Sequence, residues 1–424
     1  MVIMMFIIFA FLLFLGMPVT FAMSISGFIT VLSIGNISGT LFPQRLFMSL
    51  DSFPLMAVPF FIFAGEIMSK SGIIQRIVRF ASVLLGTLPG SLAHVNILAS
   101  MIMAGFSGSA TADATALGGM IIPAMLEDGY PPGFTAGVTA ASACIGPIIP
   151  PSCTMVIYGA ITGLSVGQLF FAGIIPGILI GISLMIITAF YAKKNKWSKG
   201  EKPTIPKIID AFKQTFFALI APLIILGGIM TGVVTATEAG VLTAFYALII
   251  GLFIYKEIGL RDLPKIILQS AINTAVPLII ISGASIFGWV LAYSNFAGIL
   301  SNSLFSITNN TNILALLIIG MLLVVGLFLE GGAATIIFVP ILFPLGFELG
   351  FDPIHFAMII MITILIGTIT PPVGLQLYIA ANIAKIPIEE VLILPFAFSM
   401  ICVVFLLTYI PGLVTFIPSI FFGN

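Results

Sequence analysis

The sequence predicts an all-α polytopic membrane protein. Three observations carry this prediction: the composition, the length of the apolar runs and an internal repeat. Of the 424 residues, 60% are hydrophobic and only 7% are charged, whereas a typical soluble domain has roughly 25% charged residues. A soluble fold of this size could not cover its surface with so few charges. The chain is therefore expected to lie in a lipid bilayer.

The apolar runs indicate that the spans are helices. Inside lipid, only helices and closed barrels satisfy the backbone polar groups, and barrel strands would alternate apolar with polar residues. This chain instead has unbroken apolar stretches such as Phe170–Tyr191 and Phe216–Val234. A helical span needs about 20 such residues, so about ten to twelve spans are expected. We interpret Met1–Leu15 as the first of them.

Charge, cysteine and histidine content exclude several functions. The 15 Lys and Arg balance the 15 Asp and Glu, so nothing favours a nucleic-acid partner. Cys144, Cys153 and Cys402 show no CxxC spacing, and His94 and His355 are the only histidines. A disulfide framework, a zinc site and haem chemistry are therefore not expected.

The lysines predict the topology, because Lys and Arg collect in cytoplasmic loops. Seven lysines lie in Lys193–Lys213, which is the clearest inside loop, and Lys256–Lys265 is a second. Between them, the apolar blocks 215–234 and 239–255 are expected to form a hairpin that leaves the cytoplasmic side and returns to it.

The two halves of the chain resemble each other. Three motifs recur in the same order at offsets of 218, 216 and 221 residues (275 − 57, 312 − 96 and 371 − 150). Basic residues follow the first copy of the first motif but not the second copy, so the repeats are predicted to face opposite ways. Inverted repeats are typical of secondary transporters, in which broken helices meet at the midplane. The motif pairs are Ala57–Pro59 with Ala275–Pro277, Asn96–Ala99 with Asn312–Ala315, and Gly146–Pro151 with Gly367–Pro372.

The repeat divides the chain into four expected segments. They are the N-terminal scaffold helices (1–53), repeat 1 with a re-entrant hairpin and a broken helix (54–192), a Lys-rich arm with a central scaffold hairpin (193–271), and repeat 2 with a second re-entrant hairpin and broken helix (272–424).

Two adjacent prolines break a membrane helix in each repeat, at Gly146–Ser152 and at Gly367–Pro372. Proline removes an N–H and clashes with the preceding turn. The freed carbonyls need a partner, and a hard cation such as Na⁺ is a good one. Hydroxyls at Ser152, Thr368 and Thr370 could add oxygen ligands. One such motif alone would favour a simple kink, but two related by the repeat favour an ion site.

A small, polar segment, Gly105–Gly119, is predicted to be the tip of a re-entrant hairpin, where non-helical backbone lines a cavity. It contains Asp113, and an ionisable group at that depth is a functional candidate. The alternative is a close helix contact of small residues, with Asp113 capping a half-helix. The second-repeat counterpart is Glu330–Thr335, in which Glu330 corresponds to Ser109 at an offset of 221.

Two further polar positions are left with open interpretations. Glu238 could lie in the membrane or in a solvated turn between the middle spans, and Ser165 could be an ordinary helix-end hydroxyl. Neither the tips nor the breaks have a Lys or Arg nearby. An anionic substrate would then be held by half-helix N-termini, hydroxyls and bound cations.

Two rival functions are disfavoured. Gly105–Gly108 matches the Gly-x-Ser-Gly pattern of intramembrane serine proteases, but a serine nucleophile needs a base within reach. Neither histidine is placed for that role. A passive channel could also use re-entrant tips, and unitary currents rather than saturable uptake would identify it.

Four long motifs resemble the large membrane subunit of tripartite ATP-independent periplasmic (TRAP) transporters, and the resemblance runs over nearly the whole chain. They are GFSGSATADATALGGMIIPAM (Gly105–Met125), TAASACIGPIIPPSCTMVIYGA (Thr139–Ala160), LEGGAATIIFVPILFP (Leu329–Pro344) and GTITPPVGLQLYIAANIA (Gly367–Ala384).

The resemblance implies an inverted-repeat, elevator-type transporter of the bacterial inner membrane, not an enzyme. It implies a sodium-coupled importer of an organic acid, of the sialic acid or four-carbon dicarboxylate type. The expected partners are a separate small four-helix membrane subunit and a periplasmic substrate-binding protein. The alternative is a conventional sodium/organic-anion carrier that works without a binding protein.

The resemblance also implies roles for individual residues. Substrate binding or coupling would involve six side chains, and sodium would be held mostly by backbone carbonyls at the two breaks. The six are Ser109, Asp113, Ser165, Glu238, Glu330 and Thr335, and the sodium positions are Gly146, Ile149, Pro151, Gly367, Thr370 and Pro372.

Overall fold

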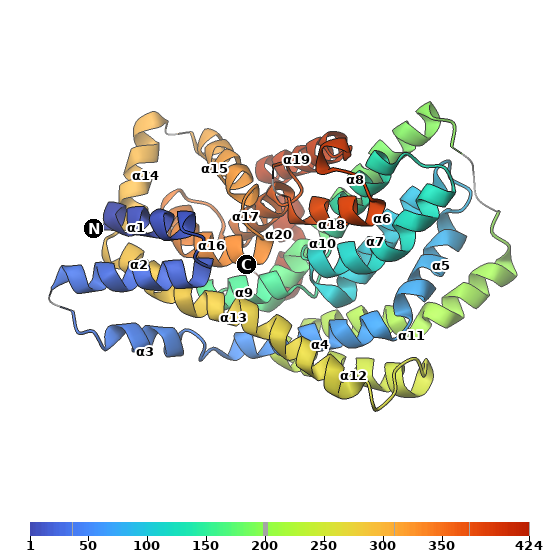
Figure 1. Cartoon of the computed structure of the whole chain (residues 1–424), viewed down its shortest axis with the longest axis horizontal. Coiled ribbons are helices and arrows are strands. Elements are labelled where there is room, and N and C mark those ends of the chain that lie inside the picture. The colour runs from blue at the N-terminus through green and yellow to red at the C-terminus, as the bar shows by residue number, and fades with distance from the viewer. Residues whose placement is uncertain (36, 198–201, 309, 373, 424) are drawn as a thin grey trace.

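The computed structural model describes residues 1–35, 37–197, 202–308, 310–372 and 374–423. Within these residues the regular structure is entirely helical (Figure 1). The predicted all-α class is confirmed.

The helices follow one another with short connections, many of them at Gly or Pro. In chain order they are α1 (Val2–Phe14), α2 (Val19–Ile34), α3 (Leu41–Met48), η1 (Phe53–Met56), α4 (Ala57–Lys70), α5 (Ile73–Leu85), α6 (Ser91–Ser107), α7 (Ala110–Glu127), α8 (Pro132–Ala143), α9 (Cys153–Thr162), α10 (Val166–Lys194), α11 (Ile205–Met230), α12 (Ala236–Ile249), η2 (Ile250–Ile254), α13 (Leu263–Tyr293), α14 (Phe296–Ile307), α15 (Thr311–Gly326), α16 (Gly331–Glu348), α17 (Pro353–Gly367), α18 (Leu375–Ala384), η3 (Ile388–Glu390), α19 (Leu394–Tyr409) and α20 (Gly412–Phe422).

In the described part of the chain, six helices are long and apolar enough to cross a membrane, or up to eight if the bent pairs α14–α15 and α19–α20 each form one span. This is fewer than the ten to twelve spans expected. Several apolar runs fold as shorter helices of 10–17 residues, among them α1, α6, α9 and α18. The 13 residues of α1 rise only about 20 Å, less than the roughly 30 Å of a hydrocarbon core. The expected first span is therefore not a full span.

The expected central hairpin is present as two candidate spans. α11 covers Ile205–Met230, and α12 with η2 covers Ala236–Ile254. The two helices pack against each other. The apolar run at Phe170–Tyr191 lies within α10.

The element order repeats between the halves. α6 and α7 form hairpin 1, and α8 and α9 are the two arms of a broken helix. α15 and α16 form hairpin 2, and α17 and α18 are again the arms of a broken helix. The second set of four helices begins 220, 221, 221 and 222 residues after the first (311 − 91, 331 − 110, 353 − 132 and 375 − 153). The four predicted sequence segments stay a prediction, because this correspondence does not define their boundaries.

The two halves interlock in space. α9 packs against α16, and its counterpart α18 packs against α7. Likewise α6 packs against α8, as α15 does against α17. A second group, α1–α5 with α11–α14, packs mainly within itself through the pairs α2–α13, α4–α12, α4–α13 and α5–α11. In Figure 1, α13 crosses α4 in the lower part of the molecule, and the two helices are in contact. We call this second group the scaffold group and the interlocked helices the hairpin group.

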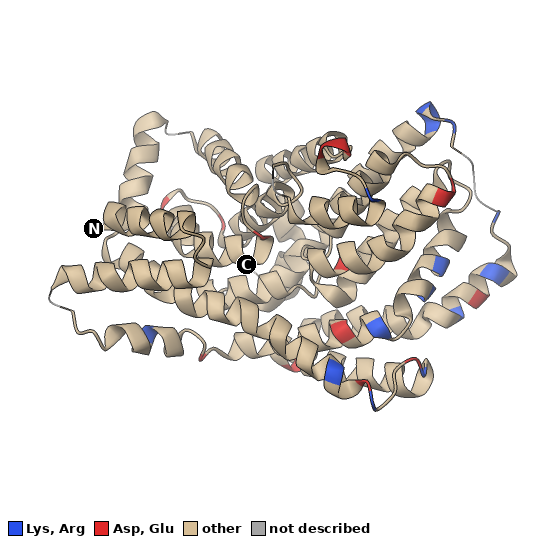
Figure 2. Cartoon of the chain, in the orientation of Figure 1, with Lys and Arg blue, Asp and Glu red and all other residues tan. Residues whose placement is uncertain are grey.

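Charge is distributed very unevenly over the molecule. Figure 2 shows most Lys and Arg toward the right of the view, among others on α5, α11 and the end of α10, while α3 at the left also carries a basic residue. Helices α1, α2, α14 and α15, at the left, carry no Lys, Arg, Asp or Glu. By the positive-inside rule, the Lys-rich end of the molecule is predicted to be the cytoplasmic one.

Candidate functional site

The tip of hairpin 1 rests on the first helix break. α6 ends at Ser107, Gly108 adopts a left-handed conformation with φ of +56°, and Ser109 caps α7 by accepting a hydrogen bond from the amide of Ala112 at 3.4 Å. A methyl group on Gly108 would lie only 2.8 Å from the carbonyl oxygen of Pro151. Glycine is therefore required here both for the backbone conformation and for this close approach.

The tip of hairpin 2 is built in the same way. Glu330 caps α16 by accepting a hydrogen bond from the amide of Ala333 at 3.0 Å. Because Ser109 and Glu330 are both N-caps of a second hairpin arm, their predicted correspondence agrees with the structure. Gly326, at the end of α15, packs so tightly on the second break that a methyl group there would lie 2.6 Å from the Cα of Gly367.

A cavity of about 770 Å³ lies between the two tips and the scaffold group. Ser109 and Glu330 both line it, so two of the predicted binding residues are brought to one cavity. Hydroxyls of Ser107, Thr111 and Thr115 lie on the hairpin 1 side, and the start of α9 contributes Thr154. Among the described residues that line this tip cavity there is no Lys, Arg or His.

The scaffold group contributes a polar wall that the sequence analysis missed. Glu66 of α4 accepts a hydrogen bond from Asn273 Nδ2 of α13 at 2.8 Å, and Gln269 Nε2 donates to Asn273 Oδ1 at 3.1 Å. All three residues line the tip cavity. The sequence does contain a signal that could have identified these residues. Each is a polar residue in an apolar helix that also contains an Ala-Val-Pro motif.

Asp113 lies in the first turn of α7 and is only 1% exposed. Neither carboxylate oxygen has a hydrogen-bond partner in the structure. Oδ2 is so close to the first break that a methyl group on Gly146 would lie 2.5 Å from it and 3.2 Å from the carbonyl oxygen of Ala143. A buried carboxylate without a partner is costly, and this oxygen-rich surrounding suits a hard cation.

The two breaks place backbone carbonyls and hydroxyls next to the tips. Each contains a cis Pro-Pro bond, Pro150–Pro151 and Pro371–Pro372. At the second break, the hydroxyl of Thr368 donates to the carbonyl of Leu365 at 2.7 Å, and that of Thr370 donates to Ile366 at 2.9 Å. The hydroxyl oxygens keep lone pairs for a cation. The predicted sodium positions Gly146, Ile149, Pro151, Gly367, Thr370 and Pro372 all fall on or beside these breaks.

Besides Asp113, three more of the predicted binding or coupling residues do not line the tip cavity. Thr335 is buried one turn into α16, where its hydroxyl donates to the carbonyl of Gly331 at 2.8 Å. Ser165 is an exposed N-cap of α10, bonded to the amide of Gln168 at 3.3 Å. Glu238 is exposed and forms a capping box with Thr235 at the start of α12. Glu238 thus takes part in a helix cap at the connection between α11 and α12.

The geometry also bears on the protease alternative. His94 and Ser107 lie on the same helix, 13 residues apart, which is about 20 Å along the axis. The ring of His355 bonds the carbonyl of Leu407 at 2.9 Å. Neither histidine is placed to take a proton from Ser107, so a serine dyad is not assembled in this structure.

Comparisons with known proteins agree on one family. A family model described as "Tripartite ATP-independent periplasmic transporter, DctM component" matches residues 6–413. The chain is 38% identical to the sialic acid TRAP transporter large permease protein of Vibrio cholerae, over 97% of this chain and 97% of that protein. It is 32% identical to the C4-dicarboxylate TRAP transporter large permease protein of Rhodobacter capsulatus, over 96% of this chain and 97% of that protein.

Other similar proteins differ in length or in sequence. The chain is 37% identical to the isethionate TRAP transporter permease protein of Oleidesulfovibrio alaskensis, over 98% of this chain but only 65% of that longer protein. The crystal structure of the YdaH transporter of Alcanivorax borkumensis has a similar fold, with a TM-score of 0.67 over 88% of each chain and 13% identity.

Proposed function

Because the chain belongs to the DctM family of tripartite ATP-independent periplasmic transporters, we propose that it moves an organic acid into the cell through the cavity between its two hairpin tips. As a member of this family it is a multi-pass protein of the bacterial inner membrane and a transporter component rather than an enzyme. The tip cavity, which Ser109 and Glu330 both line, is the observation that carries the proposal.

The transporter would work with two partners. One is a small four-helix membrane subunit, and the other is a periplasmic binding protein that delivers the substrate. The tripartite family description supports both. The small subunit would bind to the scaffold group, because this group packs mainly within itself and exposes large apolar side chains on α12 and α13.

The substrate is an organic acid of the sialic acid or C4-dicarboxylate type, as the names of similar proteins suggest. Its carboxylate would meet the N-terminal ends of α7 and α16, where amides and the helix dipoles favour negative charge. The cavity wall also holds Glu66 and Glu330 and no described cationic side chain. Bound cations are therefore needed to balance the charge of the substrate.

Sodium is proposed as that cation. Asp113, with the carbonyls near Gly146, would form one site beside hairpin 1. The carbonyls and hydroxyls near Thr370 would form a second site beside hairpin 2. Each ion carries about 2.3 kcal/mol per 100 mV across the membrane field. Two ions could therefore drive uphill uptake of a monoanion.

The cycle is proposed to be an elevator movement. Sodium orders each tip against its own break, and the substrate then docks between the tips. The hairpin group next slides along α4, α5 and α13 of the scaffold group and opens the tip cavity to the other side. The interlocking of α9 with α16 and of α18 with α7 supports movement of the hairpin group as one body.

The test is uptake of labelled acids into proteoliposomes that carry this chain with its small partner. Each acid is offered with and without a sodium gradient, and with and without the binding protein. Uptake that requires both supports the proposal and identifies the substrate. Sodium-dependent uptake without the binding protein would establish the conventional carrier instead, and unitary currents without saturation would establish a channel.

A further inference from the structure

The scaffold side of the tip cavity is formed by Glu66 of α4 with Gln269 and Asn273 of α13, which we call the polar wall. α4 packs against α6 of hairpin 1, and α13 packs against α16 of hairpin 2. Gly65, next to Glu66, lies so close to hairpin 1 that a methyl group on it would be 3.4 Å from the carbonyl oxygen of Phe106. A ligand between the tips would therefore meet the polar wall. The volume of about 770 Å³ lies within the roughly 300–1,000 Å³ of pockets for drug-sized ligands.

The hydrogen bonds of the polar wall run in one direction. An ionised carboxylate can only accept, so Asn273 turns its amide NH₂ toward Glu66, with Nδ2 at 2.8 Å from Oε1. Asn273 Oδ1 then faces Gln269 and accepts from its Nε2 at 3.1 Å. Glu66 Oε2 and Gln269 Oε1 have no hydrogen bond to any described residue. The wall therefore offers an acceptor oxygen at each end to a ligand that donates hydrogen bonds.

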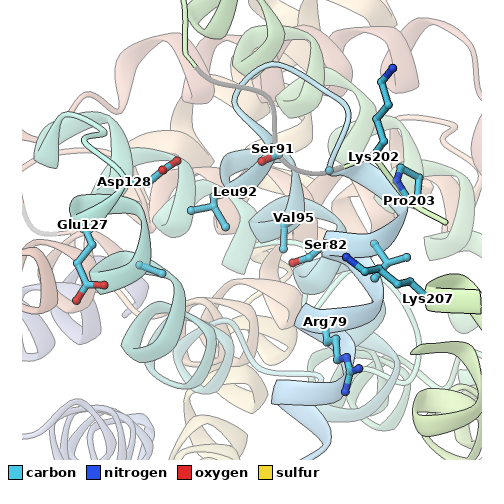
Figure 3. Close-up of a pocket in the computed structure, with 13 residues that line it drawn as sticks. Arg79, Ser82, Ser91, Leu92, Val95, Glu127, Asp128, Lys202, Pro203 and Lys207 are labelled. Carbon is cyan, nitrogen blue, oxygen red and sulfur yellow. The ribbon is translucent and has the colours of Figure 1, made fainter. Parts of the chain in front are cut away.

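No described cation balances the acids of the tip cavity. Glu66 and Glu330 line it without a described Lys, Arg or His, and neither belongs to an ion pair between described residues. Basic side chains line another cavity instead, which also measures about 770 Å³ and lies at the other end of hairpin 1 (Figure 3). The charged residues of this second cavity are Arg79, Lys202, Lys207, Glu127 and Asp128. On the polar wall of the tip cavity, nothing compensates a further negative charge.

We propose that Glu66 makes the tip cavity selective for an acid with one carboxylate and several hydroxyls, an inference that rests on the proposed transport of an organic acid. The carboxylate would lie at the tips, where the helix N-termini and the proposed sodium sites favour it. Hydroxyls at the other end would donate to Glu66 Oε2 and Gln269 Oε1. The second carboxylate of a dicarboxylic acid could only accept hydrogen bonds, and it would lie against Glu66, whose like charge opposes binding. Asn273 acts through Glu66 and is a positioning residue.

The first test uses four six-carbon acids that vary the hydroxyls and the second carboxylate independently: D-gluconate, hexanoate, galactarate and adipate. Affinity is measured from the rise in thermal unfolding temperature of the purified chain with its small partner, in sodium buffer. Gluconate is expected to bind at least about tenfold more tightly than adipate or hexanoate, because only gluconate donates several hydrogen bonds without adding a second charge. Galactarate should lie between gluconate and adipate. Adipate that binds as tightly as gluconate would overturn the proposal.

Glu66→Gln is expected to change the two affinities in opposite directions. Gluconate should bind about tenfold more weakly, because it loses a charged acceptor. Adipate should bind more tightly, because the amide removes the like charge and can donate to a carboxylate. The control is Glu348→Gln, since Glu348 is exposed at the end of α16 and outside the tip cavity. A parallel loss of both affinities, or unchanged gluconate binding, would overturn the role of Glu66.

Asn273→Leu tests the positioning role through the ratio of the gluconate and adipate affinities, which a general loss of stability would leave unchanged. The ratio is expected to fall at least about threefold, because the leucine cannot hold Glu66 toward the cavity. Asn302→Leu is the matched control, since Asn302 is exposed on α14 of the scaffold group and does not line the tip cavity. An unchanged ratio in Asn273→Leu would contradict the positioning role.

Failure of this inference can be distinguished from failure of the proposed function. The unmodified chain with its small partner and its binding protein is assayed for sodium-driven uptake of the same four acids, of succinate and of a sialic acid. Preferential uptake of succinate or adipate would overturn the selectivity inferred from Glu66, while the proposed transport would stand. If no acid binds or is taken up in sodium, the proposed function fails, and the inference fails with it.

Discussion

Asp113 shows how a single residue can connect ion binding to the hairpin tip. Its side chain is buried at the start of α7, its oxygens have no hydrogen-bond partner, and it lies against Gly146 of the first break. Asp113 lies in the first turn of α7 and is not its N-cap, which is Ser109. A cation between Asp113 and the break would compensate the buried charge and hold the tip in place.

We expect Asp113→Asn to raise the sodium concentration needed for half-maximal uptake more than about a hundredfold. The amide keeps the shape but removes the charge, and an uncompensated buried ion partner costs about 3 kcal/mol or more. The measurement is uptake against sodium concentration in proteoliposomes. Asp51→Asn is the control, because Asp51 is exposed in the turn after α3. An unchanged sodium dependence in Asp113→Asn would rule out Asp113 as an ion ligand.

At the scale of elements, each hairpin tip and its neighbouring break form one unit. Gly108 meets the carbonyl of Pro151, and Gly326 meets Gly367. These close approaches are between backbones, so a single added methyl group would push a tip away from its neighbouring break. The polar ends of the half-helices are thereby held where a substrate could reach both.

Gly108→Ala is expected to reduce sodium-driven uptake at least about tenfold, because its methyl group would meet the break at 2.8 Å and a small misplacement at a binding site is costly. The control is Gly350→Ala, which also has a positive φ, of +79°, but no atom within 4 Å. Both variants carry the left-handed backbone penalty of about 1–2 kcal/mol. If the two variants lost uptake equally, the contact with the break would not matter.

Gly326→Ala tests the crossing of α15 with the second break. The methyl group would lie 2.6 Å from Gly367 Cα, so a lower thermal unfolding temperature in detergent is expected. Gly320→Ala in the same helix has no atom within 4 Å, and it should be neutral or stabilising by up to about 1 kcal/mol. A comparable loss of stability in both variants would contradict the close crossing.

At the scale of the whole molecule, the hairpin group meets the scaffold group where α6 packs against α4 and α5 and where α16 packs against α13 and α14. The first of these contacts is a seam along hairpin 1, from the tip cavity to the second cavity at the other end of hairpin 1, which Ser82 and Ala124 line. Movement of the hairpin group against the scaffold group would have to occur along this contact.

The test introduces the double variant Ser82→Cys with Ala124→Cys, whose thiols face the second cavity from α5 and α7. Joining the two thiols with a cleavable bifunctional reagent is expected to stop uptake, and cleavage of the reagent should restore it. The background replaces Cys153 and Cys402 by Ala. The control pair is Phe80→Cys with Phe212→Cys, because these rings lie 6.2 Å apart within the scaffold group. Uptake that continues after complete cross-linking of Ser82→Cys to Ala124→Cys would exclude an elevator movement along this seam.

Local sequence signals predicted much of the site. Adjacent prolines marked both breaks, and the small polar run around Gly108 marked the first tip. Both signals act through the backbone of their own segment, so no partner is needed to interpret them. The counterpart positions Ser109 and Glu330 followed from the repeat and proved to be the same N-cap position in the two hairpins.

Other features could not be predicted from local sequence. Glu66 and Asn273 are 207 residues apart and meet only because α4 packs against α13. The number of spans was overestimated because an apolar run does not reveal whether its helix crosses the bilayer or stops halfway. The sequence left the roles of Ser165 and Glu238 open. In the structure, Ser165 is the N-cap of α10, and Glu238 takes part in the capping box at the start of α12.

The sequence by itself thus determined the membrane environment, the helical class, the repeat, the breaks and the family. These depend on composition and on the backbone preferences of short segments, and both are set by the sequence without any contact to distant residues. Only the tertiary structure decided which polar groups share a cavity, where the unpartnered Asp113 lies, and that a second cavity with opposite charges lies at the base of hairpin 1. Those features arise from packing between distant helices, and such packing depends on the shape of the whole molecule.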